Sequence, residues 1–76
     1  MKDLIVHVAK LLVDEPKDVR VEEKQRDQTT VFELRVHKED LGKVIGKNGR
    51  TAHAMRSLLG VLSAREGRRA ILEIVE

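Results

Sequence analysis

The most informative segment of the chain is residues 42–50, which read GKVIGKNGR. Gly46 and Gly49 stand three positions apart, with a Val-Ile pair before them and a basic residue after them. Because glycine has no Cβ, this spacing predicts a sharp turn whose backbone a ligand can approach closely. Glycine pairs are also common in plain helix connections, so a binding role needs support from the flanking sequence.

Apolar residues recur at helical spacing on both sides of this loop. They predict a short helix over residues 39–45 and a longer one that begins right after Gly49 and runs to about residue 64, where Glu66-Gly67 would end it. Because the loop follows a helix and not a strand, a Rossmann fingerprint is excluded. The missing Gly-Lys-Ser/Thr sequence likewise excludes a mononucleotide P-loop.

The loop has the features of an anion site. The long helix would begin right after Gly49, so its first N–H groups and the positive end of its dipole would point into the loop. Lys47 lies within the loop, and Lys43 and Arg50 flank it. Asn48 can cap the following helix. This combination suits a phosphodiester backbone.

The remaining pattern predicts an α+β architecture. An amphipathic helix is expected over residues 3–13 and is stopped by Pro16, because the residue before a proline is disfavoured in a helix. Alternating residues predict strands over 18–26, 30–37 and 69–75, the first two joined by a hairpin turn at residues 26–29. The order is α-β-β-α-α-β, with helices covering one face of a three-stranded sheet.

Composition narrows the function classes. With 76 residues and no cysteine, the chain is expected to be a single small domain, residues 1–76, without a thiolate zinc site, thiol nucleophile or redox pair. The three histidines lack ligand spacing, and no acidic pair or nucleophile elbow is present, so we expect no metal, no cofactor and no enzymatic activity. We find neither a long apolar run nor a signal-peptide pattern, and therefore expect a cytoplasmic protein without membrane contact.

Positive charge is unevenly distributed. The net charge is +2, yet residues 43–69 carry seven basic side chains against Glu66 alone. This segment predicts a basic face. Arg65, Arg68 and Arg69 either extend that face or are simply solvated around a turn, and the sequence leaves both interpretations open.

Residues 44–49, VIGKNG, resemble the signature of the KH domain, an RNA-binding module whose Gly-x-x-Gly loop clamps nucleic-acid backbone. The chain after the loop is long enough for only one helix and one strand, so the extra helix and strand precede it. This arrangement resembles the type II, or prokaryotic, KH fold, and the resemblance covers essentially the whole chain.

The resemblance also implies which residues contact single-stranded RNA. They are the loop and its flanks, Gly46, Lys47, Asn48, Gly49, Lys43, Val44, Ile45 and Arg50. Phosphates would lie along the loop N–H groups and Lys47, and bases would enter an apolar groove formed by Val44 and Ile45. Many KH signatures carry isoleucine three residues after the second glycine, whereas this chain has Ala52.

A KH domain of this size is similar to the KhpA family of small bacterial proteins. That likeness implies RNA binding with low sequence selectivity, in the manner of an RNA chaperone or regulator. It further implies a homodimer, or a heterodimer with a larger Jag-like KH protein, and a role in RNA regulation and in cell-envelope, cell-shape or division control.

The long helix itself favours a partner surface. Gly60 interrupts it at a cost of about 1 kcal/mol relative to alanine, which suggests close backbone packing. The apolar residues around Gly60 exceed what one buried stripe needs, so we expect a helix-mediated homodimer through Leu59, Gly60 and Val61. The same pattern would arise if Leu59 or Val61 packs under the first helix.

The alternative function is a protein-interaction module in which RNA contact is incidental.

Phe32 is the single aromatic residue and alternates with core positions. We therefore expect it to be buried and not to stack on a base. Without stacking platforms, one domain should bind RNA weakly and with strong salt dependence. A dimer or a tethered partner would raise the affinity through avidity.

Overall fold

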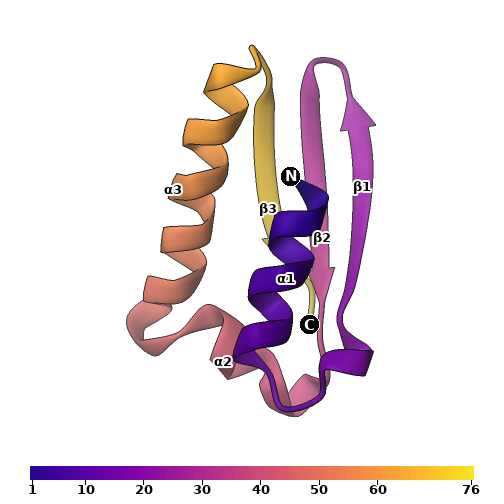
Figure 1. Ribbon diagram of the computed structural model, residues 1–76, viewed down its shortest axis with the longest axis vertical. Helices are drawn as coiled ribbons and strands as arrows, with labels where there is room; N and C mark the ends of the chain where they lie inside the picture. Colours follow the sequence, from indigo (N-terminus) through magenta and orange to yellow (C-terminus); the bar gives the residue numbers. More distant parts are fainter.

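The chain packs its helices on one face of a three-stranded sheet, as Figure 1 shows. This is a computed structural model that describes residues 1–76. The elements follow the predicted order: α1 (Lys2–Leu12), β1 (Arg20–Arg26), β2 (Thr29–Arg35), α2 (Leu41–Ile45), α3 (Arg50–Arg65) and β3 (Arg69–Ile74). The predicted α+β class and layer arrangement are confirmed.

The sheet is mixed, with the strand order β1-β2-β3. β1 pairs antiparallel with β2, and β2 pairs parallel with β3. The hairpin between β1 and β2 is a two-residue turn, Asp27-Gln28, in which Asp27 has a φ of 55°. Aspartate tolerates this left-handed conformation better than most residues, which explains why the turn forms without a glycine.

Short 3-10 turns shift the element ends by one or two residues from the predicted ones. Pro16–Asp18 forms such a turn, so β1 begins at Arg20. Lys38–Asp40 forms another before α2, and here the His37 side chain accepts a hydrogen bond from the Glu39 N–H at 3.2 Å. Proline at the start of the first turn needs no backbone donor there, which explains why it is tolerated.

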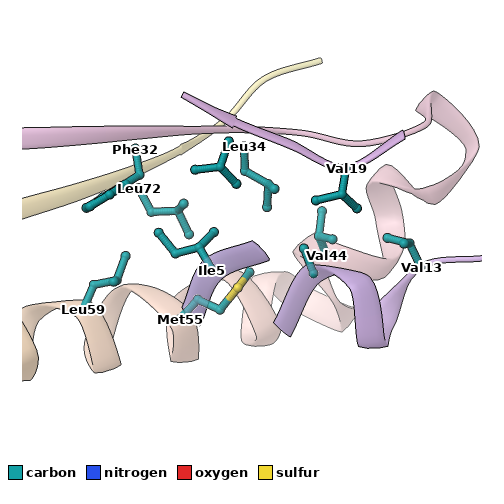
Figure 2. Close-up of a cluster of buried hydrophobic side chains, with 11 residues drawn as sticks. Ile5, Val13, Val19, Phe32, Leu34, Val44, Met55, Leu59 and Leu72 are labelled. Carbon is teal, nitrogen blue, oxygen red and sulfur yellow. The ribbon is translucent and has the colours of Figure 1, made fainter. Parts of the chain in front are cut away.

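The core lies between the sheet and the two long helices, as Figure 2 shows. Ile5 from α1 and Leu59 from α3 meet Phe32 and Leu34 from the central strand, and Leu72 joins them from β3. Phe32 is 1% exposed, which confirms its predicted burial. None of the helices is both long enough and apolar enough to span a membrane.

The opposite face of the sheet carries no helix. Ile71 on β3 is 45% exposed there, although its neighbour Val31 on β2 is buried. An ion pair between Lys24 and Glu33, 3.2 Å apart, crosses β1 and β2 in the adjoining rows. One face of the sheet is therefore covered by the helices and the core, whereas the other carries an ion pair and the exposed Ile71.

Candidate nucleic-acid interface

The loop between α2 and α3 is held by a cluster of left-handed backbone conformations. Gly46 has φ 79° and ψ 170°, Asn48 has φ 57°, and Gly49 has φ 74°. Within the loop, the Gly46 N–H donates to the Gly42 carbonyl at 2.9 Å, and the Gly49 N–H donates to the Gly46 carbonyl at 3.1 Å. The chain thus turns between two helices in four residues, which needs residues that tolerate positive φ.

The two glycines of the loop serve different purposes. A Cβ on Gly46 would lie 2.7 Å from the Thr51 Cβ and 2.8 Å from the Thr51 nitrogen, and it would overlap Thr51 Oγ1. A Cβ on Gly49 would meet no atom within 4 Å. Gly46 therefore allows α3 to begin close to the end of α2, whereas the space above Gly49 is open to a ligand.

Asn48 does not cap α3, contrary to the prediction. The N-cap position of α3 is Gly49, and no side chain bonds to the first turn. Asn48 is exposed and left-handed, and asparagine is enriched in that conformation. Its side chain is consequently available at the loop surface, and the positive end of the α3 dipole has no side-chain cap.

Fewer N–H groups of the loop are free to bind phosphate than the sequence predicted. Besides the Gly46 and Gly49 bonds, the Arg50 N–H donates to the Lys47 carbonyl. Lys47 and Arg50 are both exposed, and no carboxylate lies within salt-bridge distance of either side chain. Cationic side chains and the helix dipole are therefore the main anion-attracting features of the loop.

Lys43 forms ion pairs with two carboxylates. Its ammonium group lies 2.8 Å from Asp14 Oδ2 and 3.3 Å from Asp40 Oδ1. Hydrogen bonds from the ammonium group to Asp14 and then Asp40 raise the pKa of Lys43. Lys43 thus ties α2 to the segment after α1, and its contact with RNA stays a prediction.

Asp40 is the buried partner in this cluster, with 2% of its surface exposed. Its Oδ2 accepts the Glu15 N–H at 3.0 Å. Burial by itself would raise the pKa of Asp40, but hydrogen bonds from the Glu15 and Asp14 backbone and from Lys43 outweigh it and lower the pKa. No local sequence pattern indicates a role for Asp40, because its partners Asp14 and Glu15 lie far away along the chain.

Val44 and Ile45 do not form a groove together. Val44 is 0% exposed and belongs to the core in Figure 2. Ile45 is half-buried at the end of α2. The prediction that Val44 contacts bases is therefore wrong, because the short helix turns this position toward the sheet, and only Ile45 remains accessible.

Arg56 lies on α3, about two turns beyond the loop. Its Nε donates a hydrogen bond to the Leu72 carbonyl at 3.3 Å. Alternate residues of β3 direct their backbone groups toward β2, and Val75 is one of them, because its N–H donates to the Leu34 carbonyl. Leu72 lies an odd number of positions from Val75, so its carbonyl faces away from β2. Arg56 thus places a guanidinium group at the free edge of β3, a position that only the fold reveals.

The residues predicted for a dimer interface separate onto different sides of α3. Leu59 is 2% exposed and packs in the core, so its assignment to a surface is wrong. Val61 is 56% exposed. A Cβ on Gly60 would meet no atom within 4 Å, so the expected close backbone packing does not occur within this chain.

Arg65, Arg68 and Arg69 lie at the far end of α3 from the loop, near the hairpin turn of β1 and β2 (Figure 1). The basic face predicted from the charge distribution is therefore divided between two ends of the molecule. In addition, no three His, Asp or Glu side chains come together in a way that could hold a metal ion.

Comparison with known proteins agrees with this geometry. A family profile described as "KhpA/KhpB, KH domain" matches residues 2–74. A protein of Halalkalibacterium halodurans named "RNA-binding protein KhpA" is 47% identical to this chain over the full length of both. Proteins of the same name from Aquifex aeolicus and Chlamydia pneumoniae are 47% and 46% identical, covering 100% of this chain and 96% and 97% of theirs.

A similar fold also occurs in a crystal structure of a variant of Aquifex aeolicus Era bound to a GDP complex. The TM-score is 0.60 at 24% identity, and the match covers 96% of this chain but 28% of that one. This likeness concerns the fold alone. The order α-β-β-α-α-β and the mixed sheet agree with a type II KH fold. Together with the matching profile and relatives, they establish that the chain belongs to the KhpA/KhpB family of KH domains.

Proposed function

We propose that this chain binds single-stranded RNA through the loop Gly46–Gly49 and that it acts as an RNA chaperone or regulator without catalytic activity. The observation that carries the proposal is the exposed, unpaired Lys47 between two left-handed glycines, at the uncapped start of α3. Relatives that match over the whole chain are named as RNA-binding proteins. Since RNA is the proposed ligand, the proposed place of action is the cytoplasm.

In the proposed complex, the RNA backbone lies across the open side of Gly49. Lys47 and Arg50 contact phosphates, and the α3 dipole favours the negative charge. Bases rest against Ile45 and along the α3–β3 edge, where Arg56 is anchored. Because the single aromatic residue is buried, stacking on a base does not contribute. Binding then depends mainly on phosphate contacts, which carry no sequence information, so we expect low sequence selectivity.

RNA titration at two salt concentrations tests this proposal. The double variant Lys47→Asp/Asn48→Asp should bind RNA more than about tenfold more weakly than the wild type, since it removes a phosphate contact and adds repulsion. A control, Lys17→Asp/Lys38→Gln, changes the net charge equally at two exposed positions outside the loop. It should retain most of the affinity.

The RNA titration also distinguishes RNA binding at the loop from the alternative function as a protein-interaction module. If the loop variant binds as well as the wild type, the loop is not the RNA site. If the wild type fails to bind at any salt concentration yet still self-associates, the protein-interaction module is the better description.

We also propose that the chain forms a homodimer, or an equivalent heterodimer with a larger KH protein, through the outer face of α1 and α3. An apolar hollow between these helices is lined by Leu4, Val8, Met55 and Leu58, together with core residues Ile5 and Leu59. Around it, Leu11 is 73% exposed, Leu58 45% and Val61 56%. Exposed apolar area concentrated on one face of so small a protein favours an interface between chains.

A further inference from the structure

A second group of cationic side chains lies at the end of the molecule opposite the loop. There, the α3–β3 turn lies beside the β1–β2 hairpin turn, and the Arg69 N–H donates to the Gln28 carbonyl at 3.4 Å (Figure 1). The group, which we call the arginine cluster, consists of Arg26, Arg65, Arg68 and Arg69, all exposed. None of them takes part in a salt bridge.

Backbone hydrogen bonds fix the turn between α3 and β3 that carries the arginine cluster. Gly67 has φ 70°, its N–H donates to the Ala64 carbonyl at 3.2 Å, and the Arg68 N–H donates to the Ser63 carbonyl at 2.9 Å. These two bonds are those of a Schellman cap. Arg65 complements the negative end of the α3 dipole, but Arg68 and Arg69 lie beyond the helix and have no such role.

Arg68 stands between two open hollows. One, of about 260 Å³, lies between α3 and β3 and is lined by Gly60, Ser63, Ala64, Arg68, Arg69 and Ala70. The other, of about 300 Å³, is lined by polar residues of both turns, Gln25, Asp27, Gln28, Gly67 and Arg68. The guanidinium groups are therefore accessible beside space that a ligand can enter.

The arginine cluster and the loop are connected along one side of α3. Arg56, bonded to the Leu72 carbonyl of β3, and Gly60, which lines the larger hollow, lie one helical turn apart on this side. α3 has 16 residues, which corresponds to a length of about 24 Å. A strand of RNA held at the loop can follow the α3–β3 edge to Arg68 and Arg69.

We propose that Arg68 and Arg69, supported by Arg26 and Arg65, form a second phosphate-binding site for the same RNA strand. The inference rests on the proposed function, because the loop provides the first contact. A KH loop clamps about four nucleotides, so a short RNA gripped there does not reach the arginine cluster, whereas a longer one does. Guanidinium groups bind phosphate in a bidentate manner, and a linear polyanion is the ligand that can bridge two cationic ends of one molecule.

The test compares an RNA of about five nucleotides with one of about twelve nucleotides. The variant Arg68→Gln/Arg69→Gln should bind the longer RNA roughly three- to tenfold more weakly. The slope of log K against log salt should also become shallower by about 1.4, which corresponds to two lost phosphate contacts on a single strand. Binding of the shorter RNA should be unchanged.

The control Lys17→Gln/Arg35→Gln removes the same charge at two other exposed positions and should affect neither RNA. Equal affinity of wild type and Arg68→Gln/Arg69→Gln for the longer RNA would overturn the inference. So would an equal loss for the shorter RNA, since the arginines would then act only through net charge. A wild type that binds neither RNA would instead overturn the proposed function itself.

Discussion

At the scale of single residues, the loop separates two reasons for having a glycine. Gly46 combines φ 79° with ψ 170°, a region that is essentially restricted to glycine, and it also packs against Thr51. Gly49 needs only the positive φ of 74°, and the space where its side chain would lie is empty. Asn48 shares the left-handed conformation without being glycine.

This difference predicts unequal effects of alanine at the two positions. Gly49→Ala should destabilise the fold by about 1 kcal/mol, the usual cost of one left-handed residue with a Cβ. Gly46→Ala should cost at least about 2–3 kcal/mol, because backbone strain and overlap with Thr51 add. Thermal or urea unfolding of both variants checks the order, and equal losses would mean that the contact with Thr51 is unimportant.

At the scale of elements, the segment after α1 is fastened to α2 through Asp14, Asp40 and Lys43. The buried Asp40 carboxylate accepts the Glu15 N–H and pairs with Lys43, which in turn reaches Asp14. The Asp40–Glu15 and Lys43–Asp14 bonds join residues that are 25 and 29 positions apart in the chain. They hold α2, and hence the start of the loop, against the N-terminal part of the chain.

The lowered pKa of Asp40 predicts how stability depends on pH. Its stabilising effect is present above the ordinary carboxyl pKa of 3.8 and is lost as the pH falls through the lower folded-state value. The raised pKa of Lys43 has the opposite sign, so its effect is lost only as the pH rises above 10.5. Between these limits, the contribution should be constant.

Urea unfolding of Asp40→Asn as a function of pH checks this expectation. The variant should be less stable than the wild type at neutral pH, and the gap should narrow as the pH falls below 3.8. Asp27→Asn, at an exposed position that also tolerates asparagine, is the control and should show no such gap. A gap that is independent of pH would contradict the assignment.

α3 contains a glycine that the isolated chain does not require. Gly60 has helical conformation, and an added Cβ would meet nothing within 4 Å. Gly60→Ala should therefore stabilise the fold by about 0.5–1 kcal/mol and raise Tm by several degrees. Gly42→Ala, at a similarly open position in α2, should act in the same direction. A lower Tm for Gly60→Ala would point to a contact at this position that requires glycine.

Over the whole molecule, the proposed RNA-binding sites and the proposed dimer face occupy different surfaces. The molecule measures 35 Å along its longest axis, and the loop and the arginine cluster lie toward opposite ends (Figure 1). The apolar hollow opens on the outer side of α1 and α3. The proposed RNA contacts and the proposed dimer face therefore lie on different parts of the surface.

A pair of matched substitutions tests which face mediates the proposed dimer. Leu58 on α3 and Ile71 on the open face of the sheet are both 45% exposed. Leu58→Lys should shift the protein to a monomer in sedimentation or light scattering and weaken RNA binding through lost avidity. Ile71→Lys should leave the association unchanged, and the reverse result would place the interface on the sheet.

Local sequence patterns were sufficient to predict the helices, the strands and the position of the loop. The spacing of Leu4, Ile5, Val8 and Ala9 in α1, and the alternation around Phe32 and Leu34 in β2, are local patterns that a buried face requires. The Gly46–Gly49 motif is equally local, because a left-handed turn restricts which residues can occupy it. Element order followed directly from these signals.

Which neighbouring residues share a surface depends on tertiary packing and could not be predicted from local patterns. Lys43 pairs with Asp14 and Asp40, and Val44 is buried in the core. Leu59 is buried although the next residue, Gly60, is exposed. The charge run of residues 43–69 was likewise split, because α3 carries its two ends to opposite parts of the molecule. Local spacing determines which side of a helix a residue takes, but the partner that covers that side comes from distant parts of the chain.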